Sequence, residues 1–358
     1  MDHAGRIAKA QSLLESTGVE GLLVTNLTNV RYLTGFSGTN GQVLVTNKGA
    51  VFMSDPRYDA RARSLVDAAP IVIYKNRLSE VLPGQLSAAG VTKLGIEAGT
   101  MTLASRDDLD ERLDGIELVP VKDVIERQRR IKDADEIART SSAVAISDQA
   151  FAWVLDRITP GVAERDLALD IEVHMRQAGA EAVAFEPIVG SGPLSAHIHH
   201  TPSDRTFEKG DLVLLDFGCR LDGYCSDLTR TVVIGPANDD QVELYDLVLK
   251  AQSAAIASVT SGARGAECDA VARAVIGEAG HADDFGHGLG HGVGLDIHEQ
   301  PTLNRISEDV LEAGHVVTVE PGVYLPGTGG VRIEDCVVVT EDGCDVLGSA
   351  PKDKLIEL

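Results

Sequence analysis

The sequence has no long apolar run, no excess of positive charge and no CxxC pair. No stretch approaches the roughly 20 apolar residues that a membrane helix needs. The N-terminus also lacks the basic segment and apolar run of a signal peptide. A formal net charge of −23 argues against nucleic acid or anionic membranes as partners, because both require a basic face. The five cysteines, an odd number, indicate reduced thiols, so we expect a cytoplasmic protein.

The chain is long enough for two domains, because it has 358 residues. Its first third alternates between strand and helix patterns, which is typical of an α/β domain. A charged run at 126–132 indicates the crossing into a second domain, and we predict domains at 1–122 and 123–358. The turn-rich segment 32–38 is either a loop or a part that faces a ligand. Strands are predicted at 21–25, 42–46, 50–53, 71–74, 94–97 and 116–119, and helices at 2–17, 56–68, 78–89 and 102–113.

The second domain repeats one order of elements. Two helices followed by strands occur twice, which predicts an α+β domain of two related halves around a pseudo-twofold axis. The helices are predicted at 134–157, 163–177, 239–260 and 267–279, and strands at 183–189, at 211–233 as a hairpin, and between 294 and 340.

The hairpin at 211–233 carries two carboxylates inside its strands, Asp216 and Asp227. Their midpoint falls between Leu221 and Asp222, so a simple hairpin places them opposite each other, with Cβ atoms roughly 4.5–5.5 Å apart. Carboxylates that close repel each other, so either a shared proton or a cation is required between them.

A second carboxylate pair, Glu320 and Glu334, favours a cation. These residues are symmetric about residue 327, inside a glycine-rich turn. Arg332 cannot offset four inward carboxylates, whereas two divalent metals held roughly 3.5–4 Å apart could, and they would acidify a shared water. A histidine of the glycine-rich segment 286–294 is the remaining candidate ligand. Oxygen-rich ligation with one imidazole suits Mn, Co or Zn.

Four sequence motifs stand out in the second domain: LLDFGCRLDGYCSDLTRT, GHGLGHGVGLDIHE, TVEPGVY and GVRIEDCVVV. They resemble those of the pita-bread metallopeptidases, which include aminopeptidase P, prolidase and methionine aminopeptidase. The NVRYLTGFSG and DPRY segments of the N-terminal part resemble the creatinase-type domain of the Xaa-Pro branch. The resemblance implies a creatinase-like α/β domain followed by a pita-bread catalytic domain. It also implies the metal ligands Asp216, Asp227, His291, Glu320 and Glu334.

The same resemblance implies roles for other side chains. His199 and His298 would hold the substrate and stabilise the oxyanion, and Glu320 would also carry a proton to the leaving proline nitrogen. Arg332 would support the ligands, and Tyr324 would line the site. From the residues alone, the plainer interpretation of His197, His199 and His200 is a structural or surface role for each. The resemblance changes this interpretation only for His199.

We therefore expect a dinuclear Xaa-Pro aminopeptidase, with Xaa-Pro dipeptidase (prolidase) as the alternative and a non-catalytic binding module as a remote one. Prolidases that resemble this chain tend to carry an arginine shortly after the histidine matched by His298. Here Thr302 and Asn304 are uncharged, and only Arg305 is cationic. Manganese is the favoured metal, with cobalt or zinc as alternatives. The expected partners are proline-containing peptides and a second copy of the chain in a homodimer.

Overall fold

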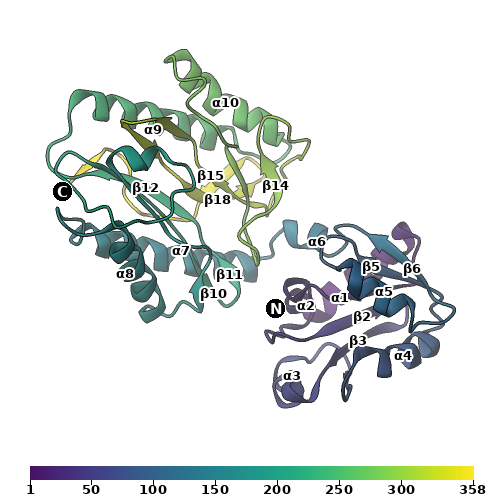
Figure 1. Cartoon of the computed structure of the whole chain (residues 1–358). Coiled ribbons are helices and arrows are strands. Elements are labelled where there is room, and N and C mark those ends of the chain that lie inside the picture. Colours follow the sequence, from purple (N-terminus) through teal and green to yellow (C-terminus); the bar gives the residue numbers. More distant parts are fainter. The chain divides into compact units, whose positions relative to one another are not determined.

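The computed structural model describes all 358 residues (Figure 1). The chain divides into two compact units, Met1–Arg129 and Arg130–Leu358. This division keeps helix α6 (Glu126–Arg130) almost wholly with the first unit, whereas the sequence boundary at 122/123 precedes that helix. The sequence boundary stays a prediction.

The first unit is a six-stranded mixed sheet with helices, as predicted for an α/β domain. Its strand order is β4-β3-β2-β1-β5-β6, with β1 antiparallel to β2 and parallel to β5. The strands are β1 (Gly21–Val24), β2 (Gln42–Thr46), β3 (Gly49–Ser54), β4 (Ile71–Ile73), β5 (Lys93–Glu97) and β6 (Glu117–Val121). The helices are α1 (His3–Thr17), α2 (Leu27–Thr34), α3 (Asp59–Leu65), α4 (Leu82–Ala89) and α5 (Leu103–Asp110), with short 3-10 turns at Pro56–Tyr58 and Leu78–Glu80.

The sequence analysis missed helix α2, whose last residues cover the start of the turn-rich segment 32–38. The Asn26 side chain caps it by accepting a hydrogen bond from the Thr28 N–H, and Gly35 ends it with φ 74°. Asparagine before a helix and glycine after it are the ordinary cap signals, so this helix could have been found.

The second unit contains two halves, each with two helices followed by a sheet that is antiparallel apart from the parallel pairing of β12 with β20 (Figure 1). The first sheet is β20-β12-β9-β8 and the second is β14-β13-β15-β18-β19. The first half has α7 (Ala134–Leu155), α8 (Glu164–Gln177), β7 (Ala182–Val183), β8 (Ile188–Ser191), a 3-10 turn (Gly192–Ala196), β9 (Leu212–Phe217), β10 (Cys219–Leu221), β11 (Tyr224–Cys225) and β12 (Leu228–Val233). The second half has α9 (Asp239–Ser258), α10 (Gly265–Glu278), β13 (Gly290–Gly292), β14 (Glu299–Leu303), β15 (Val316–Val319), β16 (Gly322–Leu325), β17 (Gly329–Arg332), β18 (Asp335–Thr340) and β19 (Gly343–Val346), and β20 (Ile356–Glu357) then returns to the first sheet.

The register of the first hairpin differs from the prediction. Leu221 pairs with Tyr224, so the turn is centred on Asp222 and Gly223, which have φ 49° and 91°. This is the two-residue Asp-Gly turn, whose positive φ values match the twist of the strands. Asp216 therefore pairs with Thr229, and the prediction that it lies directly opposite Asp227 is wrong. Because side chains alternate along a strand, Asp227 is instead a diagonal neighbour of Asp216 on the same face.

The second hairpin has the predicted register. Val319 pairs with Asp335 and Gly322 with Arg332, so the pairing is symmetric about residue 327, as are Glu320 and Glu334. Both glutamates lie where one ladder ends and the next begins, between β15 and β16 and between β17 and β18.

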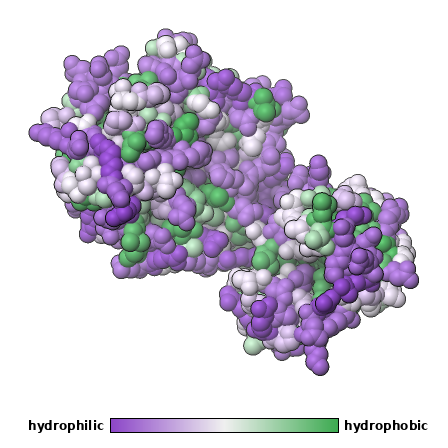
Figure 2. All heavy atoms as spheres, viewed as in Figure 1, coloured by the Kyte–Doolittle hydropathy of each residue, from purple (hydrophilic) through white to green (hydrophobic).

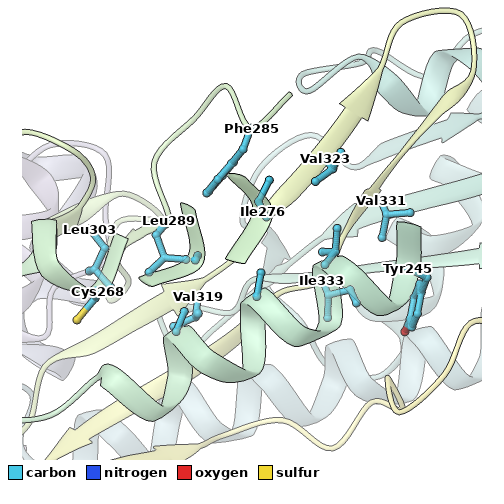
Figure 3. Close-up of a cluster of buried hydrophobic side chains, with 14 of the residues drawn as sticks. Tyr245, Cys268, Ile276, Phe285, Leu289, Leu303, Val319, Val323, Val331 and Ile333 are labelled. Atoms are coloured by element: carbon cyan, nitrogen blue, oxygen red, sulfur yellow. The ribbon is translucent and has the colours of Figure 1, made fainter. Parts of the chain in front are cut away.

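Alternation along these strands points the carboxylates away from the core. Val319 and Ile333 are fully buried in an apolar cluster that packs the hairpin against α9 and α10 (Figure 3). Leu215, Phe217 and Leu228 are buried in the corresponding cluster of the first half. The neighbouring residues Glu320, Glu334, Asp216 and Asp227 must therefore face the opposite side, where the two hairpins meet.

Exposed large apolar residues are few, and Figure 2 shows them as separate spots on a mostly hydrophilic surface. No helix is long and apolar enough to cross a membrane.

Candidate metal centre

The carboxylates and histidines predicted from the sequence surround one cavity of about 550 Å³ in the second unit. All five predicted ligands line this cavity, together with His199, His298 and Arg332. Tyr324 is not among the lining residues. Its hydroxyl instead contacts two of them, His287 and Arg332, at 2.7 and 2.8 Å.

Three of the predicted ligands lie close enough to share one ion. Ligand atoms of Asp227, His291 and Glu334 all lie within 4.8 Å of one another. The Nε2 atom of His291 lies 3.6 Å from Asp227 Oδ2 and 3.5 Å from Glu320 Oε1. Each of these residues comes from a different strand or strand end, so the sheet pairing of both halves holds the cluster together.

The orientation of the His291 ring favours a cation bound at Nε2. Its Nδ1 lies 3.0 Å from the Gly292 carbonyl oxygen, so Nδ1–H donates there and Nε2 carries a lone pair. Burial lowers the pKa of His291 to about 4, which keeps the imidazole neutral at neutral pH. A lone pair that faces two carboxylates at 3.5–3.6 Å is repelled by them unless a cation lies between.

Two carboxylate oxygens at the cavity are buried without a hydrogen-bond donor, Asp216 Oδ1 and Glu334 Oε1. Buried polar atoms of this kind are rare in folded proteins and point to an unrecorded ligand. Their partner oxygens are satisfied, because Arg332 donates to Asp216 Oδ2 at 2.6 Å and Thr229 donates to Glu334 Oε2 at 2.7 Å. One oxygen of each carboxylate is thus held by the protein, and the other is free for a metal. The residues fit divalent ions.

Arg332 is committed to holding this arrangement. Besides Asp216, its guanidinium donates to the Thr229 hydroxyl at 3.1 Å and to the Tyr324 hydroxyl at 2.8 Å. Each of the three guanidinium nitrogens thus donates one hydrogen bond, and the charge of Arg332 is paired with Asp216, so Arg332 orients the predicted ligands.

Two threonines support the ligands, and the sequence analysis missed both. Thr229 contacts Glu334 and Arg332, and the Thr318 hydroxyl lies 3.3 Å from Glu320 Oε1 and accepts from the His291 N–H at 3.0 Å. Each threonine stands two residues from a ligand on the same strand face, so alternation alone could have found them.

His199 and His298 are exposed to the cavity, and the His298 ring lies 4.4 Å from the His291 ring in an edge-to-face arrangement. The sequence analysis left a structural or surface role open for His197, His199 and His200. His200 also lines the cavity, whereas His197 is exposed outside it. His287 reaches the cavity too, and its ring forms hydrogen bonds with the Gly288 carbonyl and the Tyr324 hydroxyl.

The nearby cysteine, Cys225, is buried, and burial raises the pKa of its thiol to about 12, which argues against a thiolate ligand.

The pKa values of the buried carboxylates predict that the stability of the metal-free protein falls as the pH rises. Burial, with the charge of Asp216, raises the pKa of Glu320 from 4.5 to about 8, and burial with neighbouring carboxylates also raises the pKa values of Asp227 and Glu334. Well below the ordinary pKa values of 3.8 for Asp227 and 4.5 for the two glutamates, these groups are protonated whether the chain is folded or unfolded. As the pH rises to about 8 the unfolded chain has already lost the protons that the folded chain still holds, so stability falls.

We therefore expect chelator-treated protein to unfold at a lower temperature at pH 8 than at pH 5.5. One pKa unit corresponds to about 1.4 kcal/mol and 1 kcal/mol to about 2–4 °C in a domain of this size, so the difference should be several degrees. Manganese should raise Tm more at pH 8 than at pH 5.5. Scanning calorimetry measures both effects, and a metal-free protein that is more stable at pH 8 would contradict the expectation.

Comparisons with known proteins show the family of the chain. Residues 138–341 match the model of "Metallopeptidase family M24" and residues 6–131 that of the "Creatinase/Prolidase N-terminal domain". The chain is 36% identical to the "Xaa-Pro dipeptidase" of Pyrococcus furiosus over 98% of its own length and 99% of the relative. The solved "Xaa-Pro dipeptidase from Bacillus anthracis" is 40% identical, with a TM-score of 0.97 over 99% of this chain and 100% of that one. The X-Pro aminopeptidase from Thermotoga maritima MSB8 is 33% identical, with a TM-score of 0.91 over 96% and 99%. The predicted pita-bread fold and creatinase-type domain are thereby confirmed, and this chain belongs to metallopeptidase family M24.

Proposed function

We propose that this chain hydrolyses the peptide bond between an N-terminal residue and proline, with Xaa-Pro dipeptides as its preferred substrates. The observation that carries the proposal is the cavity that brings four inward carboxylates and a neutral imidazole together. Several relatives over almost the whole length of the chain are named Xaa-Pro dipeptidases, whereas the Thermotoga maritima structure is named an X-Pro aminopeptidase. The sequence analysis preferred an Xaa-Pro aminopeptidase and kept the dipeptidase as its alternative. The names of the relatives favour the dipeptidase.

Two divalent ions would be held by Asp216, Asp227, His291, Glu320 and Glu334, and we propose manganese, with cobalt or zinc as alternatives. When bound, they supply a Lewis acid and lower the pKa of water to near neutrality. The chain contributes the rest. Arg332 and Thr229 hold Asp216 and Glu334 so that their free oxygens face the cavity.

Three side chains act on the substrate in this proposal. His199 and His298 donate hydrogen bonds to the oxygen of the carbonyl under attack, where negative charge develops. Burial lowers the pKa of His298, so its ring is a neutral donor at pH 7. Glu320 accepts the proton of the attacking water at its carboxylate and passes it to the leaving proline nitrogen.

The cavity does not offer a free cation for the carboxylate end of a dipeptide. Arg332 is the only arginine or lysine that lines it, and its charge is already paired with Asp216 while its other two nitrogens donate to Thr229 and Tyr324. Thr302 and Asn304 line the cavity at the place where the resemblance leads us to expect an arginine, and Arg305 is exposed and does not line it. A bidentate arginine is the usual clamp for a carboxylate. We therefore propose that longer peptides beginning Xaa-Pro are also cleaved.

Matched peptides test the function and its length dependence together. With metal-loaded protein we expect cleavage of Ala-Pro, Ala-Pro-amide and Ala-Pro-Ala but not of Ala-Ala. Amidation or one added residue should lower kcat/KM by less than about 10-fold, because only a weak interaction with the carboxylate is lost. A loss above about 100-fold would reveal a carboxylate clamp. Absence of all Xaa-Pro cleavage would instead favour the binding-module alternative.

A homodimer is the remaining part of the proposal. Light scattering on the purified chain checks it, and a single species of 37.9 kDa would exclude it.

A further inference from the structure

Glu164 is a fully buried carboxylate outside the metal centre, at the first position of α8. It accepts five hydrogen bonds from three residues. The N–H and hydroxyl of Ser191 donate to Oε1 at 2.8 and 2.6 Å. The N–H and hydroxyl of Ser203 donate to Oε2 at 3.0 and 2.7 Å, and His200 Nε2 lies 2.8 Å from the same oxygen. Burial opposes ionisation of Glu164, but these donors outweigh it and lower its pKa.

The two oxygens of Glu164 join two different parts of the site. Ser191 ends β8, and β8 pairs with β9 so that Ile188 lies opposite Asp216, a predicted metal ligand. His200 and Ser203 belong to the segment 197–203, which carries His199 into the cavity. One carboxylate thus ties the His199 segment to the strand that presents Asp216.

His199 depends on this tie because its own ring has no hydrogen bond to the protein, and the residue is exposed in the cavity. The position of the imidazole is therefore decided by the backbone on either side. On one side His200 is held by Glu164, and on the other the short turn from Leu194 to His197 leads in from the 3-10 helix. The backbone N–H of Arg165 also donates to the carbonyl of Ser203, at the end of the segment, and that of Glu164 to the carbonyl of Arg205, just after it.

We propose that Glu164 is a positioning residue for the reaction: its carboxylate holds the segment 197–203 so that His199 reaches the scissile carbonyl. The inference rests on the proposed function, because it needs His199 to act on the substrate. Glu164 itself does not line the cavity and acts only through His200 and Ser203.

Glu164→Gln is a sharp test, because each carboxylate oxygen accepts from a backbone N–H. In either orientation, an amide NH₂ would face the N–H of Ser191 or Ser203, and a backbone donor cannot turn away. We expect kcat to fall by about 10–100-fold, the usual effect of losing a supporting partner, with KM changed by less than about threefold and bound manganese unchanged.

A double-mutant cycle separates positioning from general support of the fold. If Glu164 acts through His199, Glu164→Gln should cost less than about threefold in a His199→Ala background, because residues that act as one unit are not additive. An equal loss in both backgrounds overturns the proposal. Glu172→Gln is the matched control, since Glu172 lies on the same helix and pairs with Arg176 at the surface. It should leave kcat unchanged.

Two further outcomes are decisive. If Glu164→Gln does not fold, Ser203→Ala removes one of the same five bonds, and its smaller loss of kcat must also vanish in the His199→Ala background. A loss that persists there overturns the proposal. If the wild-type chain cleaves no Xaa-Pro peptide, the proposed function fails and the role of Glu164 fails with it, whereas an active wild type with an additive cycle sinks the role of Glu164 alone.

Discussion

Replacing Asp227 by alanine should abolish hydrolysis of Xaa-Pro peptides while leaving the chain folded. Asp227 is one of three residues whose ligand atoms lie within 4.8 Å of one another, and its Oδ2 faces the lone pair of His291. A bound divalent ion supplies several kcal/mol of transition-state stabilisation, and each 1.4 kcal/mol is about tenfold in rate. We therefore expect kcat/KM to fall by about 10³-fold or more, with fewer than two metal ions per chain by elemental analysis.

The metal-free wild type should be as inactive as this variant, but only the wild type should regain activity when metal is added. Chelation should remove activity from the wild type, and manganese or cobalt should restore it, whereas Asp227→Ala should stay inactive with either ion. Asp345→Ala, an exposed carboxylate on β19, is the control and should keep full activity. Full activity in wild-type protein that elemental analysis shows to be free of metal would refute the metal centre.

Asp227→Ala should also differ from most substitutions of buried residues in its effect on the stability of the metal-free protein. The carboxylates repel one another when metal is absent, and burial with this repulsion raises the pKa of Asp227. Removing one of them should leave the metal-free protein as stable as the wild type or more stable at pH 8. A lower Tm for metal-free Asp227→Ala at that pH would show that the side chain supports the fold directly.

The carboxylates of the candidate metal centre could be anticipated from sequence because they follow strand alternation, whereas His291 was implied only by the resemblance. Glu320 and Glu334 flank Val319 and Ile333, whose burial turns the carboxylates toward the cavity. The first hairpin was harder, because its register depends on the turn. Asp222-Gly223 forms the two-residue turn and moves the partner of Asp216 to Thr229. Asp227 still reaches the site, since a shift of two residues preserves the face of the strand.

Contacts between segments that are far apart in the chain were not accessible to the same reasoning. Glu164 stands 27 residues before Ser191 and 39 before Ser203, and no periodicity connects them. The helix that it begins was predicted, but a glutamate in a first helical turn is ordinarily explained by the helix dipole. Likewise, the engagement of Arg332 by Tyr324, Thr229 and Asp216 comes from both halves of the second unit and needed coordinates.

Alanine at His199 or at His298 should lower kcat by about 10²–10³-fold, the range found when one oxyanion donor is removed. Both residues line the cavity and are exposed in it. Neither is among the five predicted metal ligands. The metal content of both variants should therefore equal that of the wild type, and KM should change far less than kcat.

The control for His199 is its own neighbour, His197, which is exposed in the same segment but does not line the cavity. His197→Ala should stay within about threefold of the wild type, as most surface substitutions away from a site do. If His199→Ala and His298→Ala both lose metal, the two histidines are ligands and the oxyanion role is wrong. If they keep metal but raise KM with kcat unchanged, they bind substrate and transition state equally. They then contribute affinity rather than rate.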